Sequence, residues 1–227
     1  MASEQEKRAA ARRSVDFVRD GYVVGLGTGS TASYAIRFLG ERVAAGLKIR
    51  GVPTSVLSGD LAASLHIPLA NLDECPEIDL TLDGADEIDP ALQIIKGGGG
   101  ALLREKIVAS ASRKVIIIAD SSKQVTVLGK VPLPVEVVPF AEVLLARRIA
   151  ALGAFVTLRK DQAGLPFVTD EGHHLLDCGF GHIPEPARLS EELKHMPGVV
   201  EHGLFLDLAD VVLIGKDSEV IELHRIH

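Results

Sequence analysis

The chain has 227 residues, of which 47% are hydrophobic and 24% charged, as in soluble globular proteins with one large domain or one domain carrying a smaller one. The formal net charge is −7, so the chain lacks the overall positive charge typical of nucleic-acid-binding proteins. No apolar run approaches the ~20 residues of a membrane span. The start of the chain does not resemble a signal peptide, and Cys75 and Cys178 form no CxxC pair. We therefore expect a cytoplasmic protein with two buried thiols and with neither a nucleic-acid nor a membrane partner.

Short apolar runs alternate with helical stretches through the first half of the chain, which is typical of βαβ units around a parallel sheet. The apolar runs do not alternate with polar residues, as expected of strands that helices cover on both faces. Gly46 is expected to end the first of these helices, and Ser58 to cap the second. The predicted strands are 22–27, 47–53, 78–83 and 114–120, and the predicted helices are 30–46, 58–65 and 101–112.

Three closely spaced prolines in "GKVPLPVEVVP" (residues 129–139) mark a boundary, after which the pattern changes. The order strand, helix, strand, strand, helix, strand is the split βαβ arrangement of ferredoxin-like domains. Two further apolar runs then return to the buried-strand pattern and are expected to rejoin the first sheet. These elements are predicted at 134–138, 141–153, 154–160, 173–180, 185–196, 199–205, 209–215 and 219–224.

Together these elements predict an α/β protein. Its main part is a three-layer, Rossmann-like parallel-sheet domain, with a smaller ferredoxin-like α+β domain inserted before the C-terminal strands. The predicted boundaries are 1–130 for the first part of the main domain, 131–206 for the smaller domain and 207–227 for the returning strands.

A glycine-rich turn, "GLGTGSTAS" (residues 25–33), joins the first predicted strand to the first predicted helix. Such a turn presents backbone N–H groups and a helix N-terminus to an anion. In the G-x-G-x-x-G motif of dinucleotide-binding proteins, Ser30 takes the place of the third glycine, and the second predicted strand does not end in the acidic residue that would bind a ribose hydroxyl. Both departures argue against a dinucleotide site. Hydroxyl groups of Thr28, Ser30 and Thr31 indicate a site for one phosphate. The alternative is a simple helix cap by Ser30 or Thr31.

A pair of carboxylates, Asp83 and Asp86, flanks a Gly-Ala turn at the end of the third predicted strand. Open α/β sheets place their ligands at this end of their strands. A metal site formed with Asp89 is a rival interpretation, although the spacing misses the EF-hand pattern. A polar turn whose aspartates bond their own backbone is the third possibility.

Four consecutive glycines follow Lys96 in "KGGGGALLREKI", just before a predicted helix that contains Glu105. Each glycine loses more backbone entropy on folding than any other residue, so the run suggests a backbone that approaches a ligand closely. Lys96 then supplies a cation and Glu105 a base. The alternatives are a mobile surface turn, and an exposed Glu105 that only favours the helix dipole, with Leu102, Leu103 and Ile107 packed inward.

The segments "GLGTGSTA", "DGADEID", "KGGGGALLREKI" and "IADSSK" resemble, in order and spacing, the motifs of the ribose-5-phosphate isomerase A family. The likeness extends over essentially the whole chain. It implies interconversion of D-ribose 5-phosphate and D-ribulose 5-phosphate in the pentose phosphate pathway, without cofactor or metal, by a homodimer. It also implies that Glu105 is the proton acceptor, and that Asp83 and Asp86 assist ring opening.

The resemblance further implies a set of substrate-binding residues, and Lys96 among them is also implied in catalysis. Lys7 is the weaker assignment because its surroundings are less distinctive. The implied contacts are Thr28, Gly29, Ser30, Thr31, Asp83, Gly84, Ala85, Asp86, Lys96, Gly97, Gly98, Gly99, Lys123 and Lys7.

Two other functions remain as alternatives at this point. A non-enzymatic sugar-phosphate sensor on the same fold explains the phosphate turn but gives no role to Glu105 and Lys96. An enzyme of the CoA-transferase type, with a nucleophilic glutamate, explains Glu105 but requires a second acyl-binding region that we do not find in the sequence.

Overall fold

A computed structural model describes residues 2–217 and 219–225, and the chain divides into two compact units. The first unit holds the chain up to residue 85, residues 104–123 and residues from 207 onward, and the second unit holds residues 86–103 and 124–206. This division differs from the boundary expected at residue 131, because the chain enters the second unit at residue 86 and again at residue 124. The second unit therefore consists of two insertions.

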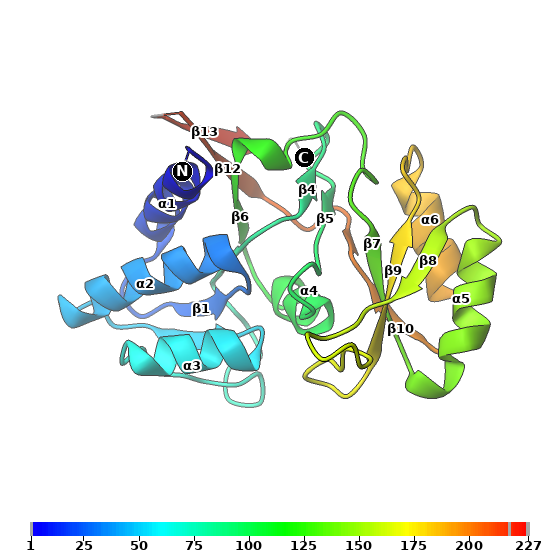
Figure 1. The fold of residues 1–227 in the computed structure, drawn as a ribbon. Helices are drawn as coiled ribbons and strands as arrows, with labels where there is room; N and C mark the ends of the chain where they lie inside the picture. Colours follow the sequence, from blue (N-terminus) through cyan, green and yellow to red (C-terminus); the bar gives the residue numbers. More distant parts are fainter. Residues whose placement is uncertain (1, 218, 226–227) are drawn as a thin grey trace. The chain divides into compact units, whose positions relative to one another are not determined.

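The first unit is built on one six-stranded sheet in the order β13-β12-β6-β3-β1-β2 (Figure 1). All neighbours are parallel except β12 and β13, which form an antiparallel pair at the edge. The predicted return of the last two strands to the first sheet is confirmed. The bounds are β1 Val23–Leu26, β2 Arg50–Pro53, β3 Leu80–Asp83, β6 Val115–Asp120, β12 Val211–Lys216 and β13 Glu219–His224.

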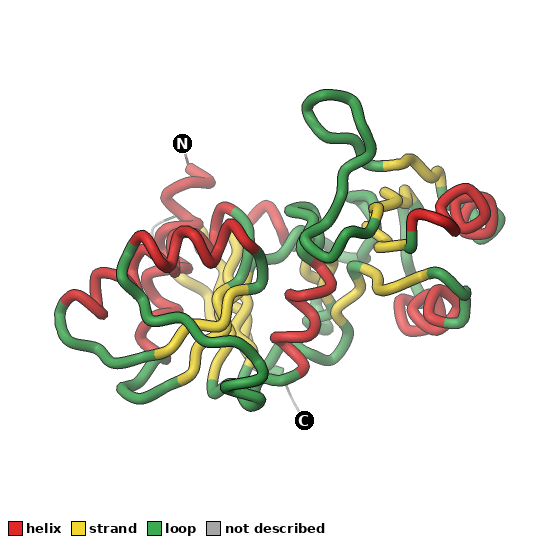
Figure 2. Tube along the Cα trace, turned by 90° about the horizontal axis from the view of Figure 1, so that it is seen from below, coloured by secondary structure: helices red, strands yellow, loops and turns green. Residues whose placement is uncertain are grey.

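Helices cover both faces of this sheet, as the unbroken apolar strands require. On one face, α1 (Ala2–Ser14), α2 (Ser30–Ala44) and α3 (Val56–Ser64) share a core with alternate residues of the strands, such as Val24. Helix α4 (Leu102–Ser110) lies on the opposite face (Figures 1 and 2). There Val108 packs with strand residues of the other parity, such as Val23. The predicted three-layer arrangement is confirmed.

The cap of helix α3 is Ser55, three residues before the expected cap at Ser58. The Ser55 side chain accepts a hydrogen bond from the Ser58 N–H group, and the Ser58 side chain accepts one from the Ser55 N–H group, both at 3.1 Å. The expectation that Ser58 caps the helix was therefore wrong: Ser58 is the third helical residue. The two serines satisfy each other's backbone donors in a capping box, in which serine takes the place of the usual Glu or Gln.

The second unit contains an antiparallel sheet in the order β10-β7-β9-β8, which is the ferredoxin-like order predicted by the alternation of strands and helices. Helices α5 (Glu142–Ala150) and α6 (Pro186–Lys194) lie on one face of this sheet (Figures 1 and 2). They bury Leu145 and Leu193 in the core of this unit. Short 3-10 turns lie at Val15–Phe17 and Ser121–Lys123 in the first unit and at Pro139–Ala141 in the second. The strands are β7 Leu133–Val137, β8 Phe155–Leu158, β9 His174–Gly179 and β10 Val199–His202.

A three-stranded sheet, in the order β11-β5-β4, was not predicted. Its strands are β4 (Glu87–Ile88), β5 (Ile94–Ile95) and β11 (Leu204–Phe205). Each has two residues, too few to show any periodicity. The single strand expected at 199–205 is broken at Gly203, whose backbone contacts the carbonyl of Lys96 so closely that a side chain there would overlap with it.

Both cysteines are buried, as expected. Burial raises the pKa of the Cys178 thiol to about 12. The thiolate is the reactive form, so we expect neither thiol to react with an aromatic disulfide reagent at pH 8 until the chain is unfolded. Time-resolved absorbance with and without denaturant measures this. Rapid reaction of Cys178 in the folded protein would contradict its burial.

No helix among residues 2–217 and 219–225 combines the length and apolar character needed to cross a membrane.

Candidate active site

The candidate site of the first unit lies where the strand order reverses. Strand β1 pairs with β2 on one side and β3 on the other, so the loops that follow β1 and β3 leave the same edge of the sheet. This reversal is where open α/β sheets bind their ligands. The glycine-rich turn follows β1, and Asp83 ends β3.

Asp83 is buried, with 1% of its surface exposed, and its Oδ1 atom ties the two loops together. This oxygen accepts hydrogen bonds from the Thr28 N–H group at 3.2 Å and the Gly84 N–H group at 2.7 Å. Gly27 adds a backbone bond to the carbonyl of Leu82 at 2.9 Å. The carboxylate of Asp83 is therefore held rigidly beside the glycine-rich turn.

The start of α2 has no side-chain cap. Gly29 occupies the N-cap position with φ of 104°, and Ser30 and Thr31 are the first two helical residues. The alternative interpretation of Ser30 or Thr31 as the helix cap was therefore wrong. The first N–H groups of a helix have no intrahelical partners, so this turn offers them, together with the exposed Ser30 hydroxyl, to an anion.

The Thr28 hydroxyl has partners that the sequence did not indicate. Its Oγ1 atom lies 2.7 Å from both Thr54 Oγ1 and Ser55 Oγ, at the end of β2. Thr54 and Ser55 are buried. These side chains brace the glycine-rich turn from the neighbouring strand, and only the chain's path in space reveals them.

Glu105 lies in α4 and is 3% exposed, whereas Ile107 is 43% exposed. The expectation that Ile107 packs inward and leaves Glu105 on a different side was wrong. Leu102, Glu105 and Val108 recur every three residues, so they share the buried face of this helix. A carboxylate removed from water in this way is not the exposed residue that the dipole interpretation requires.

The glycine run lies in the second unit, and its glycines have distinct structural roles. Gly97 and Gly100 have positive φ values of 102° and 82°, which residues with a side chain rarely adopt. The N–H group of Gly98 donates a hydrogen bond of 2.7 Å to Asp86 Oδ2, and a Cβ atom on Gly98 would lie 2.8 Å from Asp86 Oδ1. The run is an ordered loop fitted around the carboxylate of Asp86.

Arg159 fixes the opposite side of this loop and was missed by sequence reasoning. Its Nη1 atom donates to the carbonyls of Gly97 and Gly98 at 2.9 and 3.3 Å. Its Nε atom donates to Asp177 Oδ2 at 2.9 Å, and its Nη2 atom pairs with Asp177 Oδ1. Because Arg159 lies 62 positions after Gly97, no local pattern could have indicated this contact.

Lys96 is also part of the second unit and is 3% exposed. Its N–H group donates to the carbonyl of Gly203 at 2.9 Å, and its Nζ atom lies 5.6 Å from the centre of the Phe205 ring. The backbone of Lys96 is thereby tied to the segment that leads into β11.

The two remaining predicted contacts, Lys7 and Lys123, belong to the first unit. Lys7 on α1 forms an ion pair of 3.0 Å with Glu4, which also accepts a hydrogen bond from the hydroxyl of Tyr34. Lys123 ends the 3-10 turn that follows β6. Within this unit the structure thus holds Thr28 to Thr31, Asp83, Gly84, Ala85 and Glu105 along with the two lysines.

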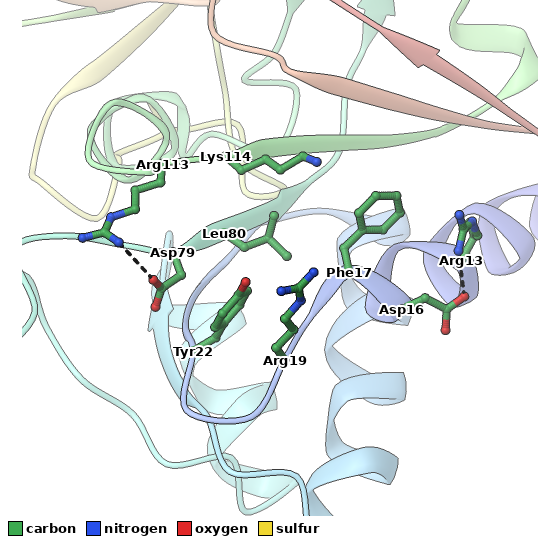
Figure 3. Close-up of a pocket in the computed structure, with 9 residues that line it drawn as sticks. All are labelled: Arg13, Asp16, Phe17, Arg19, Tyr22, Asp79, Leu80, Arg113 and Lys114. Carbon is green, nitrogen blue, oxygen red and sulfur yellow. Dashed lines mark hydrogen bonds and ion pairs between the residues drawn. The ribbon is translucent and has the colours of Figure 1, made fainter.

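A cavity of about 430 Å³ lies at the opposite edge of the first sheet. Tyr22, Asp79 and Lys114 line it where they precede β1, β3 and β6 (Figure 3). Arg13 and Arg113 at its rim are paired with carboxylates. It contains none of the predicted site residues, so it is not the candidate active site. In the part of the chain that the structure describes, no three His, Cys, Asp or Glu side chains are grouped to hold a metal ion.

Comparison with known proteins gives the family. Residues 50–219 match the family model of ribose 5-phosphate isomerase A (phosphoriboisomerase A). Ribose-5-phosphate isomerase A of Parvibaculum lavamentivorans is 51% identical over 98% of this chain and 100% of its own length. That of Sphingopyxis alaskensis is 54% identical over 97% of this chain and 96% of its own length. The chain belongs to the ribose-5-phosphate isomerase A family.

Solved structures of the family have the same fold throughout. A D-ribose-5-phosphate isomerase in complex with phospho-erythronic acid superimposes with a TM-score of 0.96 at 40% identity, covering 99% of this chain and 100% of its own. The ribose 5-phosphate isomerase of Plasmodium falciparum has a TM-score of 0.95 at 36% identity, with the same coverage. Membership of the ribose-5-phosphate isomerase A family confirms the resemblance and sets aside the sensor and CoA-transferase alternatives.

Proposed function

We propose that this chain interconverts D-ribose 5-phosphate and D-ribulose 5-phosphate by proton transfer through an enediolate, in the non-oxidative branch of the pentose phosphate pathway. As a member of its family the chain is an aldose–ketose isomerase. The observation that carries the proposal is the pair of buried carboxylates, Asp83 and Glu105, in a unit whose glycine-rich turn offers free helix N–H groups.

Glu105 acts as the base in this proposal. Isomerisation requires one group that removes a proton from C2 of the aldose and returns it to C1 of the ketose. A carboxylate held on a helix and shielded from water can do both, because its position relative to the reacting carbons does not change between the two transfers.

Lys96 and the loop of Gly97, Gly98 and Gly99 stabilise the enediolate oxygens. Charge that develops during the reaction is best stabilised by donors already fixed in place. The contacts of Arg159 and Asp86 with the glycine loop supply this rigidity, since they hold its carbonyls and one of its N–H groups.

Asp83 and Asp86 assist opening of the sugar ring, for which one group protonates the ring oxygen and another accepts the proton of the C1 hydroxyl. Gly84 and Ala85 line the turn between them. Asp83 already accepts two backbone hydrogen bonds and Asp86 one, so each carboxylate is oriented before substrate binds.

The phosphate binds at Thr28, Gly29, Ser30 and Thr31, and Lys7 and Lys123 contribute positive charge. No cofactor or metal takes part in the proposed reaction. Binding energy from the phosphate, remote from the reacting carbons, orients the sugar for proton transfer.

Comparing phosphorylated and unphosphorylated substrates tests the proposed function. We expect ribulose 5-phosphate to form from ribose 5-phosphate in the presence of excess chelator. We expect ribose to be a very poor substrate, with turnover as well as affinity reduced, because the remote phosphate orients the reacting carbons. A coupled assay measures kcat/KM for both sugars. Comparable values for the two would contradict the phosphate site, and activity that requires an added divalent metal would contradict a metal-free mechanism.

We also propose that the protein is a cytoplasmic homodimer. An apolar surface on α5 and β8 supports the dimer, because Val143 and Phe155 are 62% and 77% exposed and line the same groove of the second unit. Contiguous exposed apolar surface of this kind usually marks an interaction site.

Phe155→Asp is expected to convert the dimer to monomer, because it places a charge on the apolar surface of α5 and β8. Sedimentation velocity measures the change. Leu57→Asp, at another exposed leucine on α3, is the matched control and should remain dimeric. A monomeric wild-type protein at micromolar concentration would contradict the proposed dimer.

A further inference from the structure

Glu6 is a buried carboxylate of the first unit that the proposed mechanism does not use. It lies on α1 and is 7% exposed. Its Oε2 atom accepts hydrogen bonds from the N–H group of Ser121 at 3.1 Å and from the Ser121 hydroxyl at 2.8 Å. Its Oε1 atom accepts one from the N–H group of Asp217 at 3.2 Å. Glu6 thus joins α1 to two loops that are 115 and 211 positions away in the chain.

The turn that Glu6 holds is Ser121–Lys123, directly after β6. Buried Asp120, which directly precedes this turn, holds its second residue, since Asp120 Oδ1 accepts the N–H group of Ser122 at 3.1 Å and also the Ser122 hydroxyl. The hydroxyl and N–H groups of both serines are therefore used by two fixed carboxylates. The conformation of the turn, and with it the direction of the next side chain, is set from both sides.

The next side chain is Lys123. Although two carboxylates hold its turn, no carboxylate of residues 2–217 or 219–225 lies within 4 Å of the Lys123 ammonium group. Hydrogen bonding to the Ser121 side chain lowers the pKa of Glu6, so Glu6 keeps its negative charge at neutral pH despite the nearby carboxylate of Asp120.

A packing role alone does not require a carboxylate. Gly215 of β12 lets the backbone of α1 approach at Glu6, because a Cβ atom there would overlap with the Glu6 carbonyl. Close packing of α1 is therefore provided by the backbone and by Ala10 and Ala11 in the core. The Glu6 side chain adds the connection to Ser121, which packing does not supply.

We propose that Glu6 is a positioning residue, which acts through Ser121 to hold the Ser121–Lys123 turn so that the Lys123 ammonium group stays available to the phosphate-bearing substrate. This rests on the proposed function, in which Lys123 contacts the substrate. Glu6 itself does not touch the reacting atoms.

Glu6→Gln tests the proposal with little change in size. The amide keeps only one acceptor atom for the donors of Ser121 and Asp217 and loses the negative charge, so the anchor of the turn is weakened. We expect KM for ribose 5-phosphate and the dissociation constant of inorganic phosphate to rise about tenfold, with kcat nearly unchanged, because the lost contact acts in ground state and transition state alike. Glu41→Gln, which breaks the exposed pair between Arg12 of α1 and Glu41, is the matched control and should change neither constant.

A double-mutant cycle separates positioning from general damage to α1. In a Lys123→Ala background, Glu6→Gln should have no further effect on phosphate affinity, because its effect passes through Lys123. Ser121→Ala, which removes only the hydroxyl, should reproduce part of the loss of phosphate affinity. It replaces Glu6→Gln in the test if that variant does not fold. Amide hydrogen exchange at Ser121 should accelerate in Glu6→Gln and not in Glu41→Gln.

Two results would overturn the proposal: an equal loss of phosphate affinity with and without Lys123, or unchanged affinity and unchanged exchange at Ser121 in Glu6→Gln. Phosphate affinity and amide exchange do not depend on turnover. If the wild-type protein does not isomerise ribose 5-phosphate, the proposed function is rejected. Phosphate affinity and amide exchange would still decide the role of Glu6.

Discussion

Glu105→Gln is expected to lower kcat by about 10²–10⁴-fold, the usual contribution of a general base. Glutamine keeps the size of the side chain, so the buried face of α4 can accommodate it, but it cannot accept the substrate proton. KM should change much less, because the phosphate turn and the lysines supply most of the binding. Steady-state kinetics measure both constants, and the dissociation constant of inorganic phosphate measures affinity without turnover.

Isotope exchange makes this test specific. In deuterated water the wild-type enzyme should incorporate solvent label at the carbon that it deprotonates, and Glu105→Gln should not. Glu77→Gln, at a carboxylate that is 71% exposed in its side chain, controls for the loss of one charge in the same unit. A folded Glu105→Gln variant with near-wild-type kcat and label exchange would reject Glu105 as the base and direct attention to Asp83 and Asp86.

Gly27→Ala is expected to damage both the fold and the site. A Cβ atom on Gly27 would lie 2.6 Å from the Cα atom of Asp83, which is backbone and cannot rotate away. The loops after β1 and β3 must therefore separate. We expect the free energy of unfolding to fall by about 1–3 kcal/mol, as for other overpacked positions. Displacement of Asp83 from the glycine-rich turn should lower kcat/KM by about 10²-fold, the typical cost of a shift of about 1 Å.

The matched control for this variant is Gly59→Ala in α3, where the added Cβ atom would lie at an ordinary 3.4 Å from the Pro53 ring. It should retain full activity and gain about 0.5–1 kcal/mol of stability from the better helix propensity of alanine. Urea unfolding and steady-state kinetics on both variants give the comparison. Normal stability and kcat/KM in Gly27→Ala would show that these loops yield without affecting the site.

The features that sequence reasoning captured are those with a local signature. Alternating strands and helices predicted the three layers, and the proline cluster at 129–139 preceded a sheet with ferredoxin-like order. The strands β4, β5 and β11 have no such signature, because each has only two residues. In addition, β11 pairs with β5 from more than 100 positions away, as between Ile95 and Leu204.

The residues of the candidate site also fall into those with a local sequence signature and those without one. The glycine-rich turn, Asp83, Asp86 and the glycine run stand next to strand and helix boundaries, where local rules apply. The burial of Glu105 was misjudged because the inward face of α4 was assigned by counting apolar residues, whereas the helix turns a carboxylate inward and Ile107 outward. Arg159 and Glu6 act on backbone groups far away in the chain, so only the folded structure identifies them.

The position of β12 has a consequence for synthesis on the ribosome. This strand lies between β6 and β13, yet it is encoded almost at the end of the chain, at Val211–Lys216. Until it emerges, β6 presents an unpaired edge made of Val115 to Asp120, which is apolar almost throughout. Exposed edges of this kind readily pair with other chains, so the nascent protein carries its greatest aggregation hazard while the second unit is being translated. Closure of the edge has to wait for the last strands of the chain.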